Sequence, residues 1–168
     1  MHVLVTAASK HGATAEIAAA IGAALGARGI LATVADPSDV TDLEGYDAMV
    51  LGSAVYAGHW LEPATGLVDR LHDAFASRPV WLFSSGPVGD PPTPDQGPVD
   101  VAGIAQITRA RSHRVFAGKL DRSKLGFGEK AIVMALRAPE GDFRDWHAIN
   151  DWAAEIAEAV TGHAPSAS

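Results

Sequence analysis

The apolar positions of this chain follow two alternating patterns. Runs of consecutive apolar residues, typical of buried strands, are separated by segments whose apolar residues lie three and four apart, typical of amphipathic helices. The predicted strands are His2–Thr6, Ile30–Ala35, Asp47–Ser53, Val80–Ser84 and Arg114–Gly118. The predicted helices are Thr14–Arg28, a segment that starts at Pro63 and carries Leu67, Val68, Leu71 and Phe75, then Val101–Arg111, and Trp146–Val160.

This alternation predicts an α/β domain with one doubly wound, five-stranded parallel sheet and helices on both faces. Because parallel crossovers are right-handed, we expect the predicted strands to lie in the order 2-1-3-4-5. We expect one domain over residues 1–160, followed by a disordered tail over residues 161–168. Ligands of such sheets bind beyond the carboxyl ends of the strands, so the loops after strands one, three and four are the candidate site.

Composition narrows the chemistry. The 168 residues include no cysteine, which excludes disulfides, Cys-ligated metal centres and a thiol nucleophile. The net charge of −7 argues against broad contact with nucleic acid, which needs a basic stripe. No apolar run is long enough for a membrane-spanning helix, and no basic segment precedes the first strand as in a signal peptide. We therefore expect a cytoplasmic protein.

The loop after the first strand joins small and hydroxyl residues to the start of a helix. Free N–H groups at a helix start favour an anion, Ser9 and Thr14 add hydroxyls, and Gly12 permits close backbone approach. The alternative is an ordinary helix start with Thr14 as its N-cap. The glycine motif of dinucleotide sites, the Walker motif of nucleotide triphosphate loops and the carboxylates of phosphoacceptor domains are all absent here.

The other two loops are "GSAVYAGHW", residues 52–60, and "SSGPVGD", residues 84–90. Small residues let a flat ring lie against the backbone, aromatic side chains can stack on it, and loop N–H groups can donate to ring carbonyls and nitrogens. The alternative is a pair of ordinary polar loops, with Trp60 only packing at the start of the next helix.

Taken together, the three loops resemble those of the flavodoxin-like family, whose S/T-x-x-G-x-T loop binds the FMN phosphate. The matching pieces are "VLVTAASKHGATAEIA", "YDAMVLGSAVYAGHW", "VFAGKL" and "DWAAEIA", and within the family they are most similar to the menaquinone-dependent protoporphyrinogen oxidase branch. The resemblance implies FMN as cofactor and a flavodoxin-like fold. It also implies protoporphyrinogen dehydrogenation with a quinone as acceptor.

The resemblance also implies the contacts of each part of FMN. The phosphate would be held by Ser9, Lys10, His11, Gly12, Ala13 and Thr14. One side of the isoalloxazine would be lined by Ser53, Ala54, Val55, Tyr56, Ala57 and Gly58. The other side would be lined by Ser84, Ser85, Gly86, Pro87, Val88, Gly89 and Asp90.

The flavin would carry the chemistry, so neither a catalytic triad nor a metal site is expected. His59 is the candidate for proton exchange near the ring, because its ordinary pKa lies near neutrality. Tyr56 and Trp60 are both candidates for stacking on the ring. The other tryptophans, Trp81, Trp146 and Trp152, are expected in the core.

The segment Lys119–Arg137 differs from the rest of the chain in charge. It carries a local charge of +3, which leaves −10 on the remainder, and Leu125, Ile132, Val133 and Leu136 fall at helical spacing. A basic amphipathic element can meet a membrane surface or an anionic substrate such as a porphyrinogen, or it can simply cover the edge of the sheet. Two further functions therefore stay open, a flavodoxin-type electron carrier for a partner protein and a flavin-free binding module.

Overall fold

The computed structural model describes residues 1–9, 12–56, 59–85, 101–116, 119–120, 141–142 and 144–161. The strands are β1 (His2–Ala8), β2 (Leu31–Ala35), β3 (Ala48–Tyr56), β4 (His59–Trp60), β5 (Val80–Ser85), β6 (Ser112–Phe116), β7 (Lys119–Leu120) and β8 (Gly141–Asp142). The helices are α1 (Ala13–Ala27), α2 (Glu62–Arg70), α3 (His72–Ala76), α4 (Val101–Thr108) and α6 (Trp146–Thr161), with a short 3-10 turn, η1 (Pro37–Asp39).

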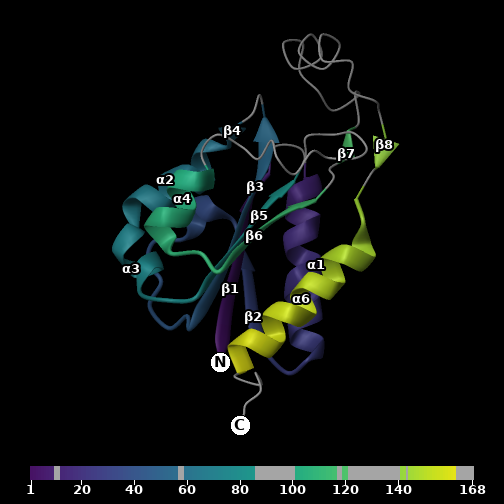
Figure 1. Ribbon diagram of the computed structural model, residues 1–168, viewed down its shortest axis with the longest axis horizontal. Helices are drawn as coiled ribbons and strands as arrows, with labels where there is room; N and C mark the ends of the chain where they lie inside the picture. Colours follow the sequence, from purple (N-terminus) through teal and green to yellow (C-terminus); the bar gives the residue numbers. More distant parts are fainter. Residues whose placement is uncertain are drawn as a thin grey trace.

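The long strands form one parallel sheet in the order β2-β1-β3-β5-β6 (Figure 1). Counted along the chain, this is the predicted order 2-1-3-4-5, so the predicted α/β doubly wound fold is confirmed. β4 adds an antiparallel partner to the end of β3, and β7 pairs with β8 in a separate two-stranded sheet. The sequence analysis did not predict these three two-residue strands, which are too short to show a periodicity.

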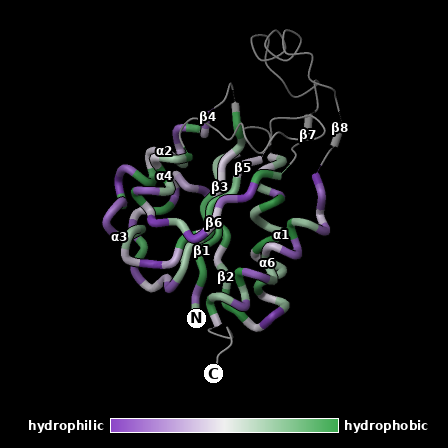
Figure 2. Tube along the Cα trace, viewed as in Figure 1, coloured by the Kyte–Doolittle hydropathy of each residue, from purple (hydrophilic) through white to green (hydrophobic). Residues whose placement is uncertain are grey.

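Helices cover both faces of the sheet (Figure 1). α1 and α6 pack against each other on one face, and α2, α3 and α4 cover the other. Two apolar cores result, because side chains of a strand point alternately to opposite faces. Phe83, Trp152 and Ile21 belong to the core under α1 and α6, and Leu82 and Phe75 to the other. Figure 2 shows hydrophobic residues along the inner strands of the sheet.

Element boundaries differ from the predictions where tertiary contacts outweigh local pattern. The helix predicted from Pro63 is interrupted at Leu71, whose φ of −122° and ψ of 27° end α2 and start α3. The helix predicted over 101–111 ends at Thr108, because Arg109 takes the left-handed conformation with φ 54°. The fifth strand begins two residues earlier than predicted, at Ser112. The tail predicted from residue 161 starts one residue too early, since Thr161 is still helical.

One of the three tryptophans expected in the core lies at the surface. Trp81 and Trp152 are buried, but Trp146 keeps 38% of its surface exposed and has the Arg144 guanidinium 4.6 Å from its ring centroid. Trp146 is the first residue of α6, before the apolar stripe of that helix meets the sheet.

Candidate functional site

The three predicted loops start from one edge of the sheet. The register pairs Ala8 with Ser53 and Ala54 with Ser85, so β1, β3 and β5 end side by side. This carboxyl edge lies at the top of Figure 1, at the tip of β3. Within the predicted set, residues 10, 11, 57, 58 and 86–90 lie outside the described residues.

The first loop turns into α1 through Gly12. Its φ of 92° is left-handed, and a Cβ there would meet nothing within 4 Å, so backbone conformation alone favours glycine. Gly12 is the N-cap residue, and its N–H donates to Ser9 Oγ at 3.0 Å. The first helical hydrogen bond runs from the Glu16 N–H to the Gly12 carbonyl at 3.1 Å, so the earlier amides of α1 have no helical acceptor.

The alternative role for Thr14, as the N-cap of this helix, is therefore wrong. Thr14 lies inside the first turn and is 2% exposed, because the turn at Gly12 starts the helix at Ala13. No side chain of a described residue caps α1. The start of α1 thus presents unpaired backbone donors next to two hydroxyl side chains, which is the chemistry of an anion site.

The predicted second loop is partly strand. β3 continues through Tyr56 and turns into β4, so Ser53, Ala54, Val55 and Tyr56 form one arm of a hairpin. The Ser53 hydroxyl is fully buried, donates to the Ala54 carbonyl at 2.8 Å and accepts from the Leu61 N–H at 2.9 Å. Its oxygen therefore holds the hairpin in place, and contact with a flavin from this residue would have to come from the backbone.

The predicted third loop likewise begins inside a strand, with Ser84 and Ser85 as the last residues of β5. Ser84 is fully buried, and its Oγ lies 2.8 Å from Trp60 Nε1 and 2.7 Å from His113 Nε2. Trp60 is 4% exposed and packs in the core on the α2 side. Its indole is therefore part of the interior and is not available to stack on a flavin, while stacking by Tyr56, the other candidate, stays a prediction.

The candidate proton-exchange residue, His59, is exposed and lies opposite Tyr56 in the hairpin. This pairing places His59 at the carboxyl edge, and its role in proton exchange stays a prediction. Among the described residues no group of three His, Cys, Asp or Glu side chains could hold a metal ion. No described helix is long and apolar enough to cross a membrane.

Sequence reasoning missed Arg144. Its Nη1 donates to Glu16 Oε1 at 2.6 Å and to the Ala13 carbonyl at 3.3 Å, and its side chain is only 5% exposed. A guanidinium is therefore packed against the first turn of α1, beside the proposed anion site. No local signal identifies this residue, because its partners lie about 130 positions earlier in the chain.

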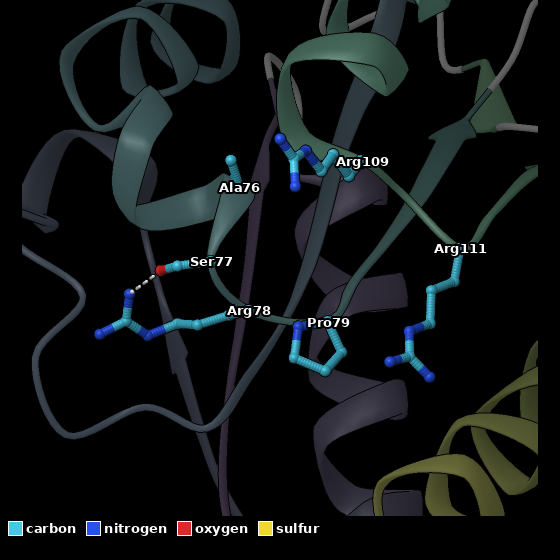
Figure 3. Close-up of a pocket in the computed structure, with 6 residues that line it drawn as sticks. All are labelled: Ala76, Ser77, Arg78, Pro79, Arg109 and Arg111. Carbon is cyan, nitrogen blue, oxygen red and sulfur yellow. Dashed lines mark hydrogen bonds between the residues drawn. The ribbon is translucent and has the colours of Figure 1, made fainter.

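A cavity of about 250 Å³ lies at the other end of the molecule. It is lined by Ala76, Ser77, Arg78, Pro79, Arg109 and Arg111, where β5 and β6 begin (Figure 3). The three guanidiniums point apart around Pro79 rather than toward one another. Arg78 donates to the Tyr46 and Ala74 carbonyls, both at 2.9 Å, so it joins the loop before β3 to α3. The cavity is thus explained by structural arginines and lies away from the carboxyl edge.

Comparisons with known proteins agree with this fold. A flavodoxin domain family profile matches residues 4–146. A flavodoxin from the domain Archaea is similar over 96% of this chain and 99% of its own, with 19% identity and a TM-score of 0.67. Oxidised flavodoxin 1 from Bacillus cereus is similar over 94% of this chain and 98% of its own, with 16% identity and a TM-score of 0.64. The rubredoxin oxygen:oxidoreductase from Desulfovibrio gigas matches 96% of this chain but 36% of its own, at 11% identity and a TM-score of 0.65. The comparison with curated proteins gave no match.

Proposed function

The chain belongs to the flavodoxin domain family, and from this premise we propose that it is an FMN-dependent electron carrier for a partner redox protein. The cofactor follows from the family and from the flavodoxins of the same fold. The observation that carries the proposal is the start of α1, where unpaired amides, Ser9 and Thr14 meet at the carboxyl edge beside β3 and β5.

The residues present fit FMN. The amides of the first turn of α1, with the Ser9 and Thr14 hydroxyls and the loop residues Lys10 and His11, would hold the phosphate. The β3–β4 hairpin would line one side of the isoalloxazine, and the loop after β5 the other. When bound, the flavin supplies the electron-accepting and electron-donating chemistry, and the protein supplies position and electrostatics.

A carrier role is favoured by the side chains at the described part of the carboxyl edge. They are mainly small or hydroxyl-bearing, and the buried hydroxyls of Ser53 and Ser84 are engaged within the protein. The titratable residues on the hairpin are Tyr56 and the exposed His59. The net charge of −7 suits a protein that docks on basic surfaces of a partner.

The test is reconstitution followed by electron delivery. The purified protein is loaded with FMN, desalted, reduced by light with a sacrificial donor, and mixed with oxidised cytochrome c as a basic acceptor protein. We expect flavin absorbance that survives desalting, and reoxidation that slows as salt rises because docking is electrostatic. Loss of all flavin on desalting would contradict the proposal and favour a binding module without flavin.

The second candidate is the dehydrogenation of protoporphyrinogen with a quinone as acceptor. The observation that favours it is Arg144, which fastens the end of the segment between β6 and α6 onto the first turn of α1. That segment includes the basic stretch Lys119–Arg137, of which only β7 is described. The cations of this stretch would recognise the carboxylates of a porphyrinogen.

This candidate is tested by changing Lys124 and Lys130 to Glu. Porphyrinogen turnover with a menaquinone analogue, or binding to vesicles of anionic lipid, should then fall steeply at low salt. FMN affinity should stay unchanged, because the phosphate would be held elsewhere. Absence of turnover and of vesicle binding in the original protein would leave the electron carrier as the function.

A further inference from the structure

A chain of three side chains joins β4, the end of β5 and the first part of β6 beneath the proposed flavin loops. Trp60 comes from β4, Ser84 from the end of β5, and His113 from β6. The Trp60 indole lies 2.8 Å from Ser84 Oγ, which in turn lies 2.7 Å from His113 Nε2. Trp60 and Ser84 are buried, and His113 is half-buried.

The direction of these hydrogen bonds follows from the donors available. An indole N–H can only donate, so Ser84 Oγ accepts from Trp60 and keeps its own proton to give. When His113 is neutral and carries its proton on Nδ1, its Nε2 accepts a hydrogen bond from the Ser84 hydroxyl. Each of the two contacts then joins one donor to one acceptor. Protonated His113 would become a donor on both nitrogens, and the Ser84 hydroxyl would then lose its acceptor.

The surroundings of His113 contain few charges. His113 pairs in register with Leu82, so both side chains point to the face covered by α4. Neither α4 nor β5 contains a titratable residue, and β4 contributes only the exposed His59. Arg114 pairs with Glu155 on the opposite face at 3.1 Å, and Arg111 lies over an indole there. Among the described residues, burial lowers the pKa of His113 without an opposing carboxylate.

We propose that His113 is a positioning residue that, in its neutral form, holds the β3–β4 hairpin and the end of β5 in the arrangement that binds FMN. The inference rests on the proposed function. Acidification through the lowered pKa of His113 turns its Nε2 into a donor, so the Ser84 hydroxyl loses its acceptor and the contact between the β3–β4 hairpin and the end of β5 weakens. FMN affinity is therefore full where His113 is neutral and falls as pH drops through the lowered pKa of His113.

The main experiment measures FMN affinity between pH 8 and pH 5 in His113→Gln and in the original protein. Gln keeps a neutral acceptor and cannot titrate. The FMN affinity of His113→Gln at pH 8 should therefore stay close to that of the original protein, and it should not decline with acid. His113→Leu, without an acceptor, binds more weakly at every pH by about 2- to 10-fold, the equivalent of one neutral hydrogen bond. His72→Gln, at an exposed histidine on α3, is the matched control and keeps the original pH profile.

A second readout needs no flavin. In the NMR spectrum of the flavin-free protein, the indole N–H signal that is lost in Trp60→Phe should shift with the same midpoint as the His113 ring. A flat Trp60 signal across that titration, or acid weakening that persists in His113→Gln, overturns the proposal. If the protein binds no FMN at any pH, the proposed function fails, and the Trp60 titration alone decides whether the three side chains are coupled.

Discussion

The packing of Phe83 over Gly52 gives a sharp test of how the sheet beneath the site is built. Gly52 and Phe83 are register partners on β3 and β5, and a Cβ on Gly52 would lie 2.2 Å from the Phe83 ring. That ring is confined by Phe116 and Trp152, at centroid distances of 6.2 and 6.0 Å. Gly52→Ala therefore overpacks a fully buried site and should destabilise the fold by about 1–3 kcal/mol.

The assay is urea unfolding, with thermal unfolding as a check. At about 2–4 °C per kcal/mol for a domain of this size, the melting temperature should fall by roughly 2–12 °C. Gly26→Ala is the matched control, because a Cβ there meets nothing within 4 Å on an exposed part of α1. It should stabilise the protein by roughly 0.5–1 kcal/mol, since alanine favours a helix over glycine.

A double-mutant cycle separates overpacking from other causes. Phe83→Leu removes ring atoms that a new Cβ on Gly52 would strike, so the two changes together should cost less than the sum of each alone. The expected coupling is about 0.5–3 kcal/mol, as for residues in direct contact. A Gly52→Ala protein with the original urea midpoint would refute the reasoning, because the ring would then have room to move.

Three other predictions concern the candidate site. Thr14→Ala should weaken FMN binding by roughly 10- to 100-fold, which corresponds to the loss of one hydrogen bond to a charged group. Riboflavin binding by this variant and FMN binding by Thr14→Ser should stay near the original, and equal losses for both ligands in Thr14→Ala would place the phosphate elsewhere. Tyr56→Leu should raise the fluorescence of bound FMN without abolishing its binding, and unchanged quenching would remove Tyr56 from the ring. Arg144→Ala should destabilise the fold by about 1–2 kcal/mol, and Glu16→Ala should destabilise it less, because the Glu16 side chain is 61% exposed and its ion pair contributes little. Equal stability losses in the two variants would contradict this.

The fold was predictable because its signals are local. Unbroken apolar runs such as Met49–Leu51 and helical spacing such as Ile17, Ile21 and Leu25 need no knowledge of distant residues. The interruption at Leu71 was not predictable, because apolar residues on both sides of it continue one helical stripe. The two-residue strands are stabilised by their partners, so their own sequences contain no signal.

That the three loops start from one edge of the sheet was predictable in the same way, whereas the contacts of each side chain were not. The rule that ligands bind at the carboxyl edge of a parallel sheet needs only the order of the strands. Whether a serine at a strand end faces a ligand or the interior depends on the neighbouring strand. Ser84 is an example, since its two partners come from β4 and β6.

Small residues at the end of β3 therefore serve two separate purposes. From the sequence alone, the small residues of "GSAVYAGHW" predict space for a flat ring against the backbone. In the structure, Gly52 makes room for Phe83 on one face, and Ser53 fixes the hairpin on the other through Leu61 and Ala54. Both contacts lie within the protein and position the hairpin against the sheet, so they would be needed with or without a cofactor. The small residues Gly52 and Ser53 are therefore accounted for by the packing of the sheet and the hairpin, and they are no evidence for a flavin by themselves.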